Sequence, residues 1–136
     1  AFRTVDHDYV LSAAKQAVAA GCRTFVLNSS LGADASSGNF YLKVKGDIEQ
    51  ALVKLEFKSL TFIRPSLLNG GPRPERRYGE EIGLWLGKRL NALIPRRYRP
   101  VSTKNVAKAM LEAALRPKSG LHIVESEALD HSMGKL

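Results

Sequence analysis

Residues 25–45, FVLNSSLGADASSGNFYLKVK, carry the pattern from which the rest of the chain can be interpreted. The apolar run at 25–27 predicts a buried strand of a parallel sheet, and a loop of small residues follows it. A helix then carries Tyr41 and Lys45, which share one helix face because they are four residues apart. Ser29 follows the strand at the edge where α/β proteins place their ligand crevice. A hydroxyl, a phenol and an ammonium can therefore converge on one point.

These three groups match the needs of carbonyl reduction. Hydride transfer to a carbonyl builds negative charge on its oxygen, which the hydroxyl of Ser29, or of Ser30 as the alternative, can hold by a hydrogen bond. The phenol of Tyr41 can deliver the proton. A free phenol titrates near pH ~10, so a neighbouring ammonium such as that of Lys45 is needed to stabilise the phenolate. In the alternative interpretation, the short Tyr-x-x-x-Lys pattern arises by chance, Tyr41 packs at a helix start and Lys45 is a solvated charge.

Three segments together resemble the short-chain dehydrogenase/reductase superfamily: Ser29–Asp34, Asn39–Gly46 and Arg64–Leu68. The most similar group is the atypical one that includes the Tat-interacting oxidoreductase and its bacterial relatives, and the resemblance extends from Val5 to about Glu127. It implies a Rossmann fold that binds NAD(P), with Ser29, Tyr41 and Lys45 as the catalytic triad. It further implies that Lys45 holds the nicotinamide ribose and that the cofactor lies against Asn28, Ser29, Tyr41, Lys45, Arg64, Pro65 and Ser66.

The expected fold class is α/β, with a doubly wound, Rossmann-like parallel sheet. The resembling family opens with a strand and a G-x-x-G-x-x-G turn that cradles the pyrophosphate at a helix N-terminus. This sequence has no such motif and starts directly before a predicted helix. We therefore expect residues 1–136 to form one domain, the C-terminal portion of an NAD(P)-binding Rossmann-like domain. The portion expected to be missing, including the first βαβ units, is on the order of 70 residues, at ~30 or more per unit.

Hydrophobic periodicity and capping signals predict the remaining elements. Helices are expected at 5–20, 39–56, 75–93 and 104–115, and strands at 24–28, 60–64 and 121–124. The breaker-rich loop 69–74 is either a substrate lid or a plain connector. Gly46 lies inside a predicted helix, where glycine costs ~1 kcal/mol relative to alanine. That cost predicts a close neighbour, with helix–helix packing favoured and cofactor approach as the alternative.

Composition excludes several classes of protein. The chain has 136 residues, 44% of them hydrophobic, which fits one domain with a core. The single cysteine, Cys22, excludes an intramolecular disulfide and a cysteine-based metal site, so we expect a reducing compartment and a cytoplasmic location. No apolar run approaches the ~18 residues of a membrane span, and no His/Asp/Glu cluster has metal-ligand spacing.

The net charge of +8 is concentrated between residues 73 and 99. Such a block can meet nucleic acid, acidic protein, anionic lipid or a phosphorylated ligand, or can be a solvated surface balanced by the missing half. Because no nucleic-acid motif accompanies the charge, the solvated surface is favoured.

Two functions follow from these observations. The first is an NAD(P)-dependent oxidoreductase acting on a carbonyl or alcohol substrate, with NADP favoured by the habit of the family. The second is a non-catalytic NAD(P)-sensing or protein-interaction module on the same fold, because fold does not fix function. In related proteins subunits often pair through the two helices that flank the catalytic strand, so a homodimer through helices 5–20 and 39–56 is possible.

Overall fold

A computed structural model of the chain describes residues 1–66, 68–69 and 101–131. Its centre is a parallel three-stranded sheet in the order β1-β2-β5, which confirms the predicted α/β class. The strands are β1 (Thr24–Asn28), β2 (Ser59–Arg64) and β5 (Gly120–Glu125). A second, two-stranded parallel pair joins β3 (Leu68–Asn69) to β4 (Val101–Ser102). Because the three main strands run the same way, their carboxyl ends meet at one edge of the sheet.

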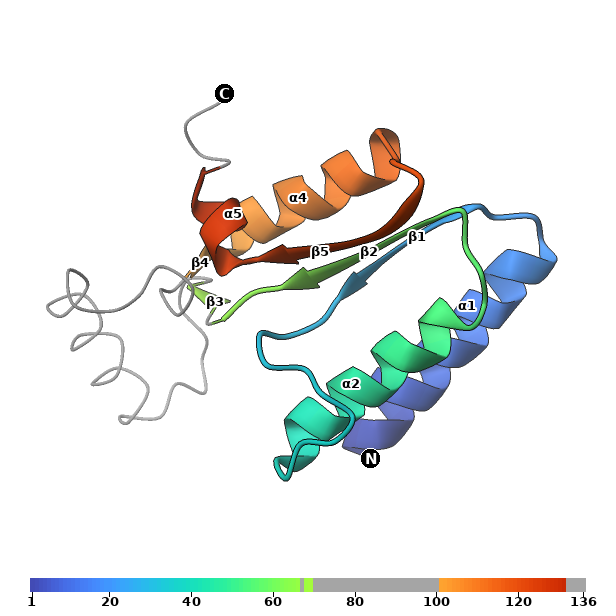
Figure 1. Ribbon diagram of the computed structural model, residues 1–136, viewed down its shortest axis with the longest axis horizontal. Coiled ribbons are helices and arrows are strands. Elements are labelled where there is room, and N and C mark those ends of the chain that lie inside the picture. The colour runs from blue at the N-terminus through green and yellow to red at the C-terminus, as the bar shows by residue number, and fades with distance from the viewer. Residues whose placement is uncertain (67, 70–100, 132–136) are drawn as a thin grey trace, which may run out of the picture.

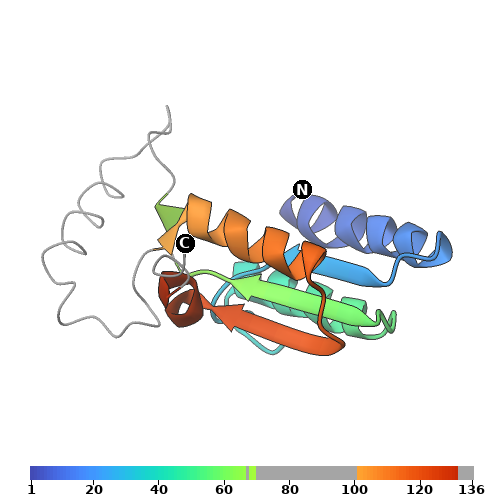
Figure 2. The same ribbon diagram turned by 90° about the horizontal axis from the view of Figure 1, so that it is seen from above.

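Helices cover both faces of this sheet (Figure 1). A π-helical segment, η1 (Thr4–Tyr9), continues into α1 (Val10–Ala19), and both lie with α2 (Phe40–Val53) on one face. On the other face lie α4 (Thr103–Leu115) and the short α5 (Ser126–His131), as Figure 2 shows from above. The chain thus forms two helical layers around a parallel sheet, the arrangement of a partial Rossmann-like fold.

Each face of the sheet has its own hydrophobic core. The core under α1 and α2 contains the buried side chains of Ala14, Leu27, Ile48, Leu52, Leu60 and Phe62. The core under α4 and α5 contains those of Ile63, Val101, Val106 and Leu129. The alternation of Phe62 and Ile63 between the two cores shows that β2 is covered on both faces, as its apolar sequence predicts.

Most predicted boundaries are close to those observed. The strand predicted at 24–28 has these bounds, and the helix predicted at 39–56 ends earlier, at Val53. The chain leaves that helix through a turn in which Glu56 adopts a φ of +59°, a left-handed conformation that a continuing helix does not allow. The helix predicted at 75–93 and the basic block 73–99 lie outside the described residues. Of the predicted loop 69–74, only Asn69 is described.

The prediction of helix–helix packing as the reason for Gly46 is wrong, because the close neighbour is the backbone of a loop. A Cβ at Gly46 would lie less than 3.0 Å from backbone atoms of Asp34 and Ala35. The close neighbour is therefore the loop that follows β1, which crosses over α2 at this point. Sequence reasoning identified the tight spot but not the segment that fills it.

No helix within the described ranges is both long enough and apolar enough to cross a membrane.

Candidate functional site

Ser29 lies directly after β1, at the carboxyl edge of the sheet. Its backbone N–H donates to the carbonyl oxygen of Ile63 at 2.7 Å, which continues the pairing of β1 with β2 by one residue. The residue is 4% exposed, and its hydroxyl has no hydrogen-bond partner among the residues that the structure describes. The alternative, Ser30, donates its hydroxyl to the carbonyl oxygen of Leu31 at 3.3 Å. A buried hydroxyl without a partner is uncommon in native proteins and calls for an explanation. Of the two serines, this observation favours Ser29 as the one that would hold a ligand oxygen.

The first turns of α2 position Tyr41 and Lys45. The helix begins after Asn39, whose side chain accepts a hydrogen bond from the backbone N–H of Leu42 at 3.3 Å, as the sequence predicts for an N-cap. The Nζ of Lys45 lies 5.6 Å from the centre of the Tyr41 ring, within the range of a cation–π contact. The Tyr41 side chain is half exposed, whereas that of Lys45 is only 12% exposed. The phenol can therefore reach a ligand while the ammonium stays sheltered beside it.

The N-terminal helical segment contacts this pair, a feature that the sequence interpretation missed. The ring of Phe2 stacks on that of Tyr41, with the ring centres 5.2 Å apart. The carboxylate of Asp6 lies 3.3 Å from the Nζ of Lys45. The i, i+4 spacing of Phe2 and Asp6 matches that of Tyr41 and Lys45 and places each pair on one face of its own helix, but it does not show that the two helices meet there.

The loop between β1 and α2 is fixed at several points. The backbone N–H of Leu31 donates to the carbonyl oxygen of Pro65 at 3.1 Å, and that of Asp34 donates to the carbonyl oxygen of Leu42 at 3.1 Å. The carboxylate of Asp34 accepts from both the backbone N–H and the hydroxyl of Ser36, each at 2.8 Å. These two hydrogen bonds hold the pKa of Asp34 below its usual value. The loop is thereby anchored to both β2 and α2, the elements that frame the candidate site.

The guanidinium of Arg64, at the end of β2, is held by the buried side chain of Glu49. Its guanidinium donates to both carboxylate oxygens of Glu49 at 2.8 and 2.6 Å, and lies 3.8 Å from the carboxylate of Glu125. The hydrogen bonds from Arg64 to Glu49 raise the pKa of the guanidinium above its usual value. This fork-shaped pair joins α2 to the carboxyl ends of β2 and β5. The side chain of Arg64 is therefore engaged with the fold, and a cofactor contact here would fall to the backbone.

The other predicted cofactor contacts are placed at the same edge of the sheet. The backbone N–H of Ser66 donates to the hydroxyl of Ser126 at 2.7 Å, and the carbonyl oxygen of Pro65 accepts from Leu31. Asn28, the last residue of β1, is exposed. Ser29, Pro65 and Ser66 thus lie at one edge of the sheet. The backbone N–H groups of Ser29 and Ser66 and the carbonyl oxygen of Pro65 already take part in hydrogen bonds within the protein. No hydrogen bond joins Ser29 to Tyr41 or Lys45 in the part of the chain that the structure describes.

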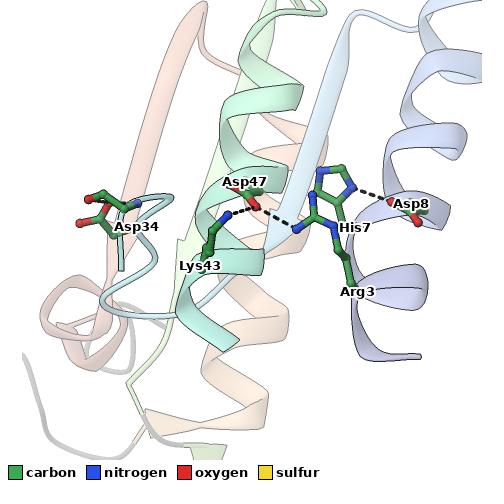
Figure 3. Close-up of polar contacts among 7 residues, drawn as sticks. Arg3, His7, Asp8, Asp34, Lys43 and Asp47 are labelled. Atoms are coloured by element: carbon green, nitrogen blue, oxygen red, sulfur yellow. Dashed lines mark hydrogen bonds and ion pairs between the residues drawn. The ribbon is translucent and has the colours of Figure 1, made fainter. Parts of the chain in front are cut away.

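A charged cluster on the outer face of α2 is separate from this site. Asp47 accepts from Arg3 at 2.9 Å and from Lys43 at 3.0 Å, and these hydrogen bonds lower the pKa of its carboxyl group (Figure 3). Lys43 therefore points away from Tyr41, as its position on the helix predicts. His7 pairs with Asp8 at 2.9 Å, and within the described ranges no three metal-binding side chains come together.

The groove between the N-terminal helices and α2 has a mixed polar lining. Its walls include Arg3, His7, Lys15, Asp47 and Lys54. The homodimer through helices 5–20 and 39–56 would involve this surface, and it stays a prediction.

Comparison with known proteins gives a consistent set of relatives. The chain is 39% identical to the rat protein HTATIP2, over 98% of the chain and 54% of the relative. It is 36% identical to the protein FMP52, mitochondrial, of Eremothecium gossypii, over 90% of the chain and 56% of the relative. The chain is a homologue of HTATIP2 and FMP52. The protein FMP52, mitochondrial, of Debaryomyces hansenii is 34% identical over 99% of the chain and 62% of the relative. The chain thus spans about half of the length of the rat and Eremothecium relatives. No protein-family model matches it.

The predicted cytoplasmic location is wrong, because several relatives are named mitochondrial. The prediction rested on the single cysteine. One cysteine excludes an intramolecular disulfide but does not distinguish between compartments in which proteins lack disulfides.

Proposed function

We propose that the chain is the catalytic half of an NAD(P)-dependent oxidoreductase of the short-chain dehydrogenase type, which interconverts a carbonyl and an alcohol. The observation that carries this proposal is the combination of Ser29 and Tyr41 with Lys45. Within the described part of the chain the buried Ser29 hydroxyl has no hydrogen-bond partner, and the phenol of Tyr41 has the Lys45 ammonium beside its ring. Homology to HTATIP2 and FMP52 supports it, together with the resemblance of the three sequence segments to this superfamily.

The domain proposed to carry out this reaction extends beyond the chain. Within the described residues β1 pairs only with β2, so the other edge of β1 carries no strand. A doubly wound sheet continues at such an edge with the strands that carry the glycine-rich turn. Residues 1–136 would accordingly be the C-terminal portion of one dinucleotide-binding domain.

The residues present fit a nicotinamide dinucleotide. The ammonium of Lys45 has three N–H donors, and Asp6, its ion-pair partner among the described residues, can accept one, so the others could bind ribose hydroxyls. The backbone at Pro65 and Ser66 would line the nicotinamide side. When bound, the dinucleotide supplies or accepts the hydride.

The proposed mechanism divides the remaining work among three side chains. Ser29 donates its hydroxyl hydrogen to the carbonyl oxygen and stabilises the negative charge that develops there. Tyr41 transfers its phenolic proton to that oxygen during reduction and takes it back during oxidation. Lys45 stabilises the phenolate that remains after proton transfer. We propose NADP rather than NAD solely because the resembling family tends to use NADP.

The test is the kinetics of Tyr41→Phe in the complete protein. The substitution deletes only the proton donor, so we expect turnover of a panel of aldehydes and ketones to fall by about 10²- to 10⁴-fold. Affinity for NADPH should change less than about threefold, since the ring and its neighbours stay. Ser30→Ala is the matched control and should keep its turnover, because Ser30 already donates to Leu31. Full turnover in Tyr41→Phe would overturn the role given to Tyr41.

A further inference from the structure

Two side chains of the N-terminal helical segment, residues 2–9, face two side chains of α2 at the same spacing. Phe2 and Asp6 are four residues apart, as are Tyr41 and Lys45. Phe2 stacks on Tyr41 at 5.2 Å and Asp6 pairs with Lys45 at 3.3 Å. One turn of the N-terminal segment and one turn of α2 are thus joined by an aromatic contact and by an ion pair.

We propose that Asp6 is a positioning residue, which holds the Lys45 ammonium beside Tyr41 and limits the positive charge that the phenol experiences. This inference rests on the proposed function, because it assigns Asp6 a part in tuning the proton donor. Asp6 is not a catalytic residue, since it acts through Lys45.

The geometry gives a reason for a fixed partner. A lysine side chain is a flexible stem of four carbons with many rotamers. An ammonium without an ion-pair partner therefore spends little time in any one position. Lys45 is 12% exposed and Asp6 is 27% exposed, so water screens this pair less than it screens the pairs on the outer face of α2. By comparison, Lys43 and Arg3, which pair with Asp47, are 48% and 44% exposed. The Asp6–Lys45 pair is therefore more sheltered than Arg3–Asp47, the other ion pair between the segment and α2 among the described residues.

The two packed elements carry several acidic, basic and histidine side chains. On the N-terminal segment they are Arg3, Asp6, His7 and Asp8, and on α2 they are Lys43, Lys45, Asp47 and Glu49. Arg3, Lys43 and Asp47 form the separate outer cluster seen in Figure 3. Removal of the Asp6 charge leaves the Lys45 ammonium uncompensated, which favours the phenolate. At the same time it removes the anchor of the ammonium.

The first test needs no added cofactor and uses the complete protein. Amines are methylated reductively with formaldehyde and a borohydride, and the extent at Lys45 and Lys43 is read by mass spectrometry. Asp6→Asn should speed methylation of Lys45 about threefold or more and leave Lys43 unchanged, while Asp6→Glu should retain most of the protection. Asp8→Asn is the matched control, because Asp8 is an exposed carboxylate on the same segment that pairs with His7. If Asp6→Asn does not fold, a rise in Lys45 methylation of the unaltered chain at high salt gives the same information.

The second test is the pH dependence of alcohol oxidation in the complete protein. In Asp6→Asn the acid limb of the profile should move, because both the charge and the position of the ammonium beside the phenol change, and the plateau of kcat should fall on the order of fivefold. A merely structural role for Asp6 would lower the melting temperature and leave the acid limb in place. Asp6→Glu should restore the limb.

The outcomes separate this inference from the function on which it rests. Unchanged Lys45 methylation in Asp6→Asn and at high salt overturns the inference, whether or not the complete protein binds NADPH. A shift in methylation without a shift of the acid limb also overturns it, because the contact would then be structural only. A complete protein without any dinucleotide-dependent turnover overturns the proposed function first, and with it the positioning role.

Discussion

Replacement of Gly46 by alanine tests the close contact between α2 and the loop that follows β1. In an exposed helix position this substitution stabilises a protein, because alanine has the higher helix propensity by ~1 kcal/mol. At Gly46 the added methyl group would meet backbone atoms of Asp34 and Ala35, all less than 3.0 Å away. Backbone atoms cannot rotate aside as the end of a flexible side chain can. The loop, which is itself tied to Leu42 and Pro65, would have to move as a unit.

The two effects oppose each other, and the steric effect should prevail. Overpacking of a tight site costs ~1–3 kcal/mol, and a site closed by backbone belongs at the upper end of this range. After subtraction of the propensity gain, we expect Gly46→Ala to lower the free energy of unfolding by about 2 kcal/mol. For a chain of this size such a loss lowers the melting temperature by roughly 8 °C.

The assay is urea denaturation followed by circular dichroism, with Gly38→Ala as the matched control. A Cβ at Gly38, in the same loop, would have no atom within 4 Å, so this variant should change the free energy of unfolding by less than about 0.5 kcal/mol. A Gly46→Ala variant more stable than the unaltered chain would refute the reasoning, because it would place the loop away from the helix.

Three further substitutions test the other features that frame the site. Asn39→Ala removes the N-cap of α2 and should cost about 1 kcal/mol of unfolding free energy in the same denaturation experiment; no change would mean that the cap hydrogen bond does not form. Glu49→Gln replaces the carboxylate that accepts two hydrogen bonds from Arg64 by a neutral amide with one acceptor oxygen. Because Glu49 is buried while Arg64 is partly solvated, we expect a loss of about 2–3 kcal/mol of unfolding free energy, with the exposed-site variant Glu56→Gln as the control. Asp34 has a lowered pKa, so its hydrogen bonds to Ser36 should stabilise the fold above about pH 4, the value of an unfolded carboxyl group, and this stabilisation should be lost as pH falls through the folded pKa. The difference in stability between the unaltered chain and Asp34→Asn should therefore be present at pH 6 and shrink as the pH falls below about 4, and a constant difference would contradict the assignment.

Local features of the fold were predictable because local chemistry determines them. The apolar run at 25–27 is short, continuous and followed by polar residues, and the strand predicted around it at 24–28 forms β1 with these bounds. Asn39 and Ser102 cap the helices that follow them, since a short polar side chain can satisfy the free N–H groups of a first turn. Tyr41 and Lys45 lie side by side because residues four apart are neighbours on the surface of a helix.

Tertiary contacts were harder to predict from one sequence. The Phe2–Tyr41 and Asp6–Lys45 contacts join residues about 39 positions apart in the chain, and no spacing rule connects two different helices. The pair of Glu49 and Arg64 depends on the angle at which α2 crosses β2. At Gly46 the sequence indicates that something comes close, but only the path of the loop identifies its backbone as the neighbour.

The central claim is that these residues belong to a dinucleotide-dependent reductase, and titration of the complete protein with NADPH tests it most directly. Isothermal titration calorimetry should give saturable binding of one dinucleotide per chain, weakened by Lys45→Met and left nearly unchanged by Lys43→Met. Lys43 is the suitable control because it lies two residues away and pairs with Asp47 on the outer face. A complete protein that binds neither NADPH nor NADH would contradict the claim, and would favour a protein-interaction module on the same fold.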